Sequence, residues 1–217
     1  VAGWYTWTSP QGALRIEVLR VGIGSAMVLR MPDGAVWVVD AGSREVAAPM
    51  ERALMPALRD AGAGRIAGIL LMGLDEVHAR DAGPVIARYR PAAVVTPAAV
   101  WSQRLYTRAG GEVEATARNV TLLTRGNSVT IDEARVTLAA TGIVMWEFAG
   151  RRVAMVDGKA LSGMLQWVDG APPCDALILT GAPARGMAEL LARVRCPVVR
   201  AGHTVSAGPD GVSVAAF

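Results

Sequence analysis

The sequence is poor in the residues that hold metals or act as nucleophiles. Its 217 residues include two histidines, His78 and His203, and two cysteines, Cys174 and Cys196. The cysteines lack the C-x-x-C spacing of a zinc or redox site, and we expect two unpaired, buried thiols rather than a disulfide. A metal centre built from several imidazoles or thiolates is therefore disfavoured.

Lysine is nearly absent as well, since Lys159 is the single lysine and every other basic residue is arginine. Such a bias is typical of a GC-rich genome and is weak evidence for arginine-specific chemistry. The net charge of +3 is modest. It permits a nucleic-acid partner without implying one.

Long apolar runs are missing too. None reaches the roughly 18 to 20 residues of a membrane span, and no signal-peptide pattern opens the chain. Because the first residue is not Met, we expect a processed protein, a trimmed chain or part of a longer one. The hydrophobic content of 52% is ample for a core. We expect a polar lead-in segment over residues 1–12 and one domain over residues 13–217.

Apolar periodicity predicts two similar halves. Each begins with antiparallel strands and then alternates helices and strands. The strands fall at residues 14–21, 26–31, 35–39, 66–72, 92–95, 120–123, 129–131, 135–140, 144–148, 152–156, 176–179, 198–201 and 212–215. The helices fall at residues 45–61, 81–89, 98–108, 161–168 and 187–194. Two mixed sheets packed face to face with helices outside give an α+β fold, an αββα four-layer sandwich.

Motifs near the start carry a family resemblance. Residues 19–26 read LRVGIGSA, a Pro32-Asp33-Gly34 turn follows, and a strand ends in Val39-Asp40-Ala41-Gly42. This order resembles the opening of the metallo-β-lactamase-like domain of the ComEC competence family, approximately L-D-V-G-Q-G-D-A, then P-x-G, then D-x-G. The resemblance implies a metallo-β-lactamase-like fold. It also implies a location at the extracytoplasmic face of the inner membrane, as part of a larger membrane protein that takes up DNA.

The metal-binding loop departs from that family. There, a strand runs into T-H-x-D-x-D-H, whose imidazoles and carboxylates surround a divalent cation that activates water. Here Gly73 stands in place of the first His and Val77 in place of the second Asp, whereas Asp75 and His78 match. Half of these ligand positions are therefore lost.

Later motifs are altered in the same way. Asp157 matches the carboxylate of a Gly-Asp motif, but residues 180–183 read TGAP where the family has His-His-Gly-Ser. In the opening motif, Arg20, Ile23 and Ser25 replace Asp, Gln and Asp. The resemblance therefore implies a degenerate site and no enzyme of the usual kind.

The surviving positions Asp75, His78 and Asp157 are relict metal ligands under this resemblance. We expect no bound cofactor; the alternative is one weakly bound divalent cation, Zn²⁺ or Mn²⁺. For His78 we favour a polar loop residue without an important partner, and for His203 a turn residue. Asp40 is expected to bond loop backbone near the site.

Arginines interleaved with aromatic residues form a second candidate site. Arg88, Arg90, Trp101, Arg104 and Arg108 would grip a single strand of DNA by charge and stacking. The alternative, which we favour, is an ordinary solvated helix surface.

Three functions follow. The first is a catalytically degenerate domain with a structural or single-stranded-DNA-binding role. The second is a residual metal-dependent phosphodiesterase or nuclease. The third is a structural protein that reuses the fold for self-association.

Overall fold

A computed structural model describes residues 13–44, 50–131, 133–170, 172–199, 203–208 and 211–216, the last two ranges as backbone. The proposed lead-in segment, residues 1–12, lies outside the described residues. The strands are Leu14–Val18 (β1), Gly24–Arg30 (β2), Val36–Ser43 (β3), Gly68–Leu70 (β4), Ala93–Pro97 (β5), Val120–Leu123 (β6), Ser128–Ile131 (β7), Ala134–Ala140 (β8), Ile143–Phe148 (β9), Arg151–Asp157 (β10), Ala176–Thr180 (β11), Val198–Val199 (β12), His203–Gly208 (β13) and Gly211–Ala216 (β14). The helices are Met50–Leu54 (η1, a π-helix), Met55–Asp60 (α1), Glu76–Ala79 (α2), Ala82–Tyr89 (α3), Ala98–Trp101 (α4), Arg104–Tyr106 (η2, a 3-10 helix), Arg108–Thr116 (α5), Leu161–Trp167 (α6) and Met187–Leu191 (α7).

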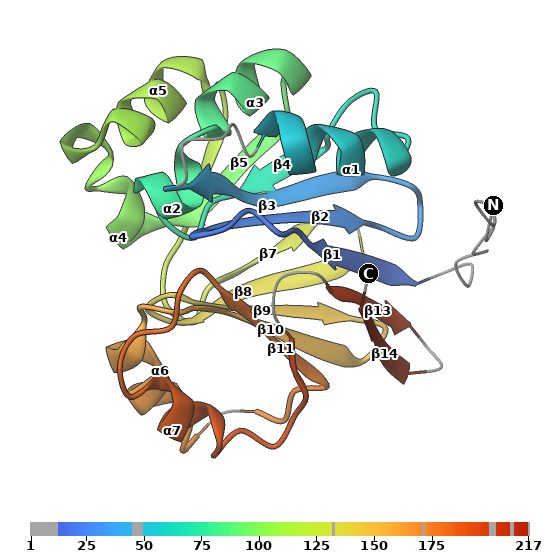
Figure 1. Ribbon diagram of the computed structural model, residues 1–217, viewed down its shortest axis with the longest axis vertical. Helices are drawn as coiled ribbons and strands as arrows, with labels where there is room; N and C mark the ends of the chain where they lie inside the picture. Colours follow the sequence, from blue (N-terminus) through green and yellow to red (C-terminus); the bar gives the residue numbers. More distant parts are fainter. Residues whose placement is uncertain are drawn as a thin grey trace.

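The strands form two mixed sheets that lie face to face (Figure 1). The first has the order β14-β13-β1-β2-β3-β4-β5-β6, and the second has the order β12-β11-β10-β9-β8-β7. In the first sheet β3 to β6 are parallel, and in the second β10 to β12 are parallel. The chain returns to the first sheet at its end, because β13 pairs antiparallel with β1.

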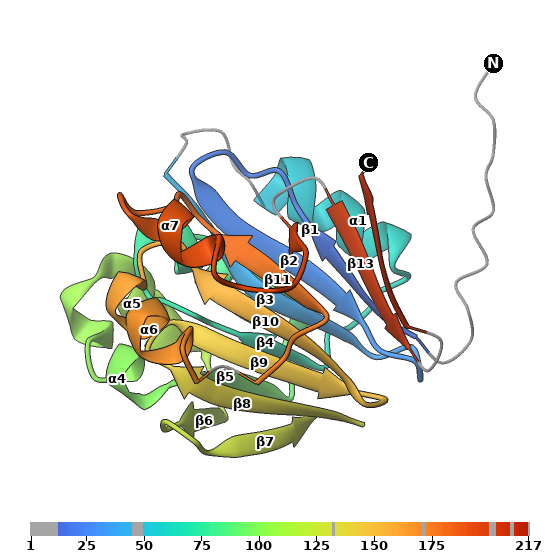
Figure 2. The ribbon, with the colours of Figure 1, turned by 90° about the horizontal axis from the view of Figure 1, so that it is seen from below.

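Strand alternation sends apolar side chains to both faces of each sheet. Ile16, Leu29 and Trp37 join the core between the two sheets, where they meet Trp146 and Met155 of the second sheet. The other face of the first sheet packs under α1, α3 and α5, and the other face of the second packs under α6 and α7. Figure 2 shows the same layers from below. The predicted αββα sandwich is confirmed.

The helix predicted over residues 98–108 is wrong. The segment is divided into α4, η2 and the start of α5, and α5 continues through Gly110 and Gly111 to Thr116. Gly110 permits close packing rather than ending a helix, because a Cβ atom there would lie 2.1 Å from the carbonyl oxygen of Arg104. His203 was placed in a turn, but it begins β13, opposite Val18 in β1.

The expectation of two unpaired thiols is also wrong. Cys174 and Cys196 form a disulfide, with Cα atoms 6.0 Å apart. The bond joins the segment before β11 to the segment before β12, which are neighbouring parallel strands. Their meeting is a consequence of strand order in the second sheet, and a sequence separation of 22 carries no signal for it.

Within the described residues, no helix has the length and apolar character needed to cross a membrane.

Candidate functional site: a remnant metal centre

Asp40 lies at the centre of the site because of a bulge in β3. Ala26 pairs with Ala41 and Met27 pairs with Val39, so Asp40 is an extra residue without a partner in β2. Its φ of 55° is unusual for a residue other than glycine. Its carboxylate is fully buried and accepts a hydrogen bond of 2.8 Å from the Met72 amide. The predicted structural role of Asp40, bonding loop backbone, is confirmed.

The loop after β4 places Asp75 and His78 together. Asp75 caps α2 and accepts hydrogen bonds from the amides of Val77 and His78, at 3.0 and 3.2 Å. The same Asp75 oxygen lies 2.8 Å from Nδ1 of His78. The His78 side chain is 2% exposed and paired with Asp75, so the prediction of a polar loop residue without an important partner is wrong.

The end of β10 supplies the opposite side of the site. Oδ1 of Asp157 lies 3.5 Å from Nε2 of His78, a long ion pair rather than a good hydrogen bond. The same oxygen accepts a 3.0 Å hydrogen bond from the Lys159 amide. The Lys159 ammonium reaches across to Oδ2 of Asp75 at 3.0 Å. Two cationic side chains and three carboxylates therefore gather where the two halves of the fold meet.

The pKa values in this cluster are strongly perturbed. Burial raises the pKa of Asp40 to about 7, although nearby His78 opposes that shift. Burial lowers the pKa of His78, but the carboxylates of Asp40, Asp157 and Asp75 overcome this effect and raise it to about 10. Burial also disfavours the ionised forms of Asp75 and Asp157, but His78 and Lys159 hold both pKa values below the ordinary range. At neutral pH His78 is therefore an imidazolium.

These residues do not fit the metal centre that the family motif implies. Both ring nitrogens of His78 face carboxylates, at 2.8 and 3.5 Å, and the Lys159 ammonium already occupies one oxygen of Asp75. A Cβ atom on Gly73 would lie 2.6 Å from Nδ1 of His78, so a ligand side chain at that position would collide with the imidazole. Val77 is buried and apolar. Among the described residues, no three His, Cys, Asp or Glu side chains are grouped to hold a metal ion.

Asp75, His78 and Asp157 come together as the resemblance implies, although metal binding by them stays a prediction. Lys159 was missed. The available signals were that it is the single lysine of the chain and that it lies two residues after Asp157. Neither identifies Asp75 as its partner, since 84 residues separate the two.

The second predicted site is divided by the fold. Arg88 and Arg90 lie at the end of α3, before β5, whereas Trp101, Arg104 and Arg108 follow β5. The two groups are therefore at opposite ends of that strand. Among the second group, the Arg104 guanidinium lies 4.9 Å from the centre of the Trp101 ring and pairs with Glu114 at 2.6 Å. Arg108 pairs with Glu112 at 2.9 Å.

Comparison with known proteins defines the fold. No family model and no curated protein matches the chain. Among solved structures, a B3 metallo-β-lactamase with an active-site glutamic acid is 15% identical with a TM-score of 0.59, and the match covers 86% of this chain and 88% of that one. The metallo-β-lactamase fold protein YhfI from Bacillus subtilis is 12% identical with a TM-score of 0.55, covering 89% and 99%. The short form of human tRNase Z is 16% identical with a TM-score of 0.54, covering 86% and 92%.

The chain therefore has a metallo-β-lactamase-like fold, as the opening motifs imply. At these identities the likeness extends to the fold alone.

Proposed function

We propose that this chain is a catalytically degenerate metallo-β-lactamase-fold domain in which His78 and Lys159 replace metal ions as the cations of the site. The observation that carries this proposal is the pairing of both cationic side chains with the surviving carboxylates, at 2.8 Å for His78 and 3.0 Å for Lys159 to Asp75. The carboxylates thereby keep opposite charges nearby without a metal. The role that remains is structural or binding, not hydrolytic.

Metal affinity tests this proposal directly. Titration of the purified chain with Zn²⁺ and Mn²⁺, together with elemental analysis, is expected to show no bound metal and no dissociation constant below about 1 mM. Lys159→Met removes the competing ammonium but leaves His78, so it is expected to gain little affinity. A stoichiometric metal that is lost in Asp157→Ala would contradict the proposal and favour a residual metal-dependent phosphodiesterase or nuclease.

The finer assignment, to a ComEC-like DNA-uptake protein, rests on the opening motifs. Under it the domain contacts the transported single strand as part of a larger membrane protein. One observation favours a contact surface beside η2. Leu105 and Tyr106 are 69% and 87% exposed, and they lie between Arg104 and Arg108 in sequence. An exposed ring flanked by guanidinium groups is typical of single-strand binding by stacking and charge.

A binding measurement with oligo-dT tests that role. We expect weak binding, with a dissociation constant on the order of 10⁻⁴ M, that falls steeply as salt rises. The affinity is limited because Arg104 and Arg108 already pair with Glu114 and Glu112. Tyr106→Ala is expected to weaken binding about tenfold through lost stacking.

The exposed Arg65 provides a matched control for that experiment, because it lies in the loop before β4. Arg65→Gln is expected to leave the affinity for oligo-dT unchanged. Equal losses in Tyr106→Ala and Arg65→Gln would contradict a specific contact at η2. Concentration-dependent oligomers without DNA binding would favour the self-associating structural protein instead.

A further inference from the structure

A separate cavity lies at the opposite end of α6 from the remnant metal centre. Asp157 and Lys159 precede α6, whereas the cavity begins at Trp167, the last residue of that helix. Its volume is about 450 Å³, which is within the range of small-molecule sites. Its walls are formed by Trp167, Val168, Asp169, Pro172, Pro173, Cys174, Arg193, Val194 and Arg195.

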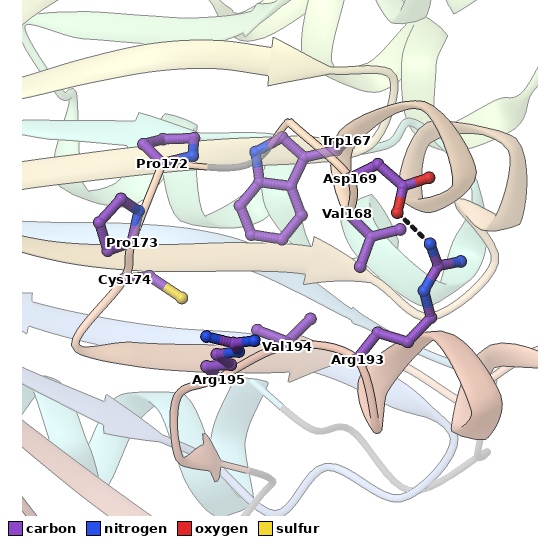
Figure 3. A pocket seen from close by; sticks show the side chains of 9 residues that line it. All are labelled: Trp167, Val168, Asp169, Pro172, Pro173, Cys174, Arg193, Val194 and Arg195. Atoms are coloured by element: carbon purple, nitrogen blue, oxygen red, sulfur yellow. Dashed lines mark hydrogen bonds and ion pairs between the residues drawn. The ribbon is translucent and has the colours of Figure 1, made fainter.

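The cavity has one apolar, aromatic side. The Trp167 side chain is 5% exposed and belongs to the core under the second sheet. Figure 3 shows its indole ring on one side of the opening, with Pro172 and Pro173 beside it and Arg195 across from it. A flat ring inserted here would contact the small exposed part of the indole and the exposed rings of Pro172 and Pro173, and it would displace water from apolar surface.

The opposite side carries a net positive charge. Arg193 pairs with Asp169, so those two charges cancel. Arg195 is exposed, and no ion pair is found for it among the described residues. Since Asp169 is the one carboxylate in the lining, the Arg195 guanidinium is available to an anion and presents the paired N–H groups that match a carboxylate.

The walls are held in place before any ligand arrives. The Cys174–Cys196 disulfide ties the segment that carries Pro172 and Pro173 to the segment that carries Arg195. The two prolines further restrict their own segment, because the pyrrolidine ring fixes φ. A rigid pocket loses little conformational entropy on binding, which favours affinity for a small ligand.

The Trp167 indole adds an unpaired donor. Its Nε1 atom is buried and has no hydrogen-bond acceptor among the described residues. In Figure 3 this atom lies on the side of the ring toward Pro172. A buried donor without an acceptor costs free energy.

We propose that this cavity binds a small aromatic monocarboxylate, with the ring against Trp167 and the prolines and the carboxylate on Arg195. The size of the cavity, the indole wall and the single unbalanced guanidinium together select this ligand class. The proposal uses no residue of the remnant metal centre, so it stands apart from the proposed function.

Calorimetric titration of the full chain with phenylacetate tests the proposal. We expect saturable binding of one molecule with a dissociation constant of about 1 mM or below. Phenylacetamide has the same shape without the charge, and acetate has the charge without the ring. Both are expected to bind at least tenfold more weakly.

Variants assign the contacts. Arg195→Gln is expected to weaken phenylacetate binding at least tenfold, whereas the exposed Arg65→Gln leaves it unchanged. Trp167→Phe keeps an aromatic wall, and the affinity for phenylacetate is expected to stay within about threefold of the wild-type value. The absence of saturation by about 10 mM phenylacetate would overturn the proposal. Equal affinity for phenylacetate and phenylacetamide in the wild-type chain would overturn it as well, independently of whether any variant folds.

Discussion

Replacement of His78 by Gln is expected to lower the free energy of unfolding by about 3 to 5 kcal/mol, the usual cost of removing one partner from a buried ion pair. The reason is geometric. Asp40 is fully buried and His78 is the principal cation near it, while Asp157 faces Nε2 of His78 at 3.5 Å. Without the imidazolium, these carboxylates must remain uncompensated or take up protons.

The free energy of unfolding, measured as a function of pH, tests whether the His78 imidazolium is responsible. The pKa of His78 is raised from 6.5 to about 10, so its stabilisation is fully present below about pH 6.5 and is lost as the pH rises to about 10. The raised pKa of Asp40 likewise means that a stabilisation present at low pH is lost as the pH rises from about 4 to 7. Urea unfolding of the wild-type chain is therefore expected to show a loss on the order of a few kcal/mol between about pH 6.5 and 10.

His78→Gln should show a much flatter dependence over that pH range. Lys159→Met serves as a control from the same cluster, because Lys159 is 43% exposed and a solvent-screened pair contributes about 1 kcal/mol or less. If the wild-type chain and His78→Gln lose stability in parallel as the pH rises, the imidazolium is not the group responsible. Below about pH 4, protonation of Asp75 and Asp157 is expected to destabilise the wild-type chain more than His78→Gln, since His78 is the largest cause of the depressed pKa values of both carboxyls.

Removal of the disulfide is the second large change that we expect. A bond that closes a loop between residues 22 apart restricts the unfolded chain and stabilises the fold by about 3 kcal/mol. Cys174→Ser with Cys196→Ser should therefore lower the melting temperature by about 6 to 12 °C in a domain of this size. Thermal unfolding followed by circular dichroism measures the difference.

The reduced wild-type chain provides the matching control. Its melting temperature should equal that of the double Ser variant, because both lack the cross-link and retain similar packing. Two reactive thiols in the unreduced chain would show that the bond is absent in solution. Disulfides persist in oxidising compartments, so the assay is run without reductant.

The sequence predicted the architecture well because strand periodicity reports directly on burial. Alternate residues of β1, such as Leu14, Ile16 and Val18, all enter the core between the sheets. The structural role of Asp40 was also predicted correctly, because the resemblance places a carboxylate here that bonds loop backbone, and Asp40 accepts a hydrogen bond from the Met72 amide. In contrast, the helix predicted over residues 98–108 was wrong, because Gly110 continues a helix here and allows α5 to approach η2.

The candidate site was predicted in part. The motif located Asp75, His78 and Asp157, but it could not indicate what replaces the metal. The ion pair of Lys159 with Asp75 spans 84 residues, and the disulfide depends on the order of strands in the second sheet. Both are products of tertiary structure, so neither leaves a pattern in the local sequence.

The single lysine has a practical consequence. Apart from the chain's α-amino group, every reagent or modifying enzyme directed at primary amines has Lys159 as its one target in this sequence. Acetylation there would remove the positive charge from the ion pair with Asp75, while Arg-specific contacts elsewhere would be untouched. A protease that cuts only after lysine would cleave this sequence between Lys159 and Ala160, just before α6. The rate of cleavage at that bond would therefore report how often the cluster opens.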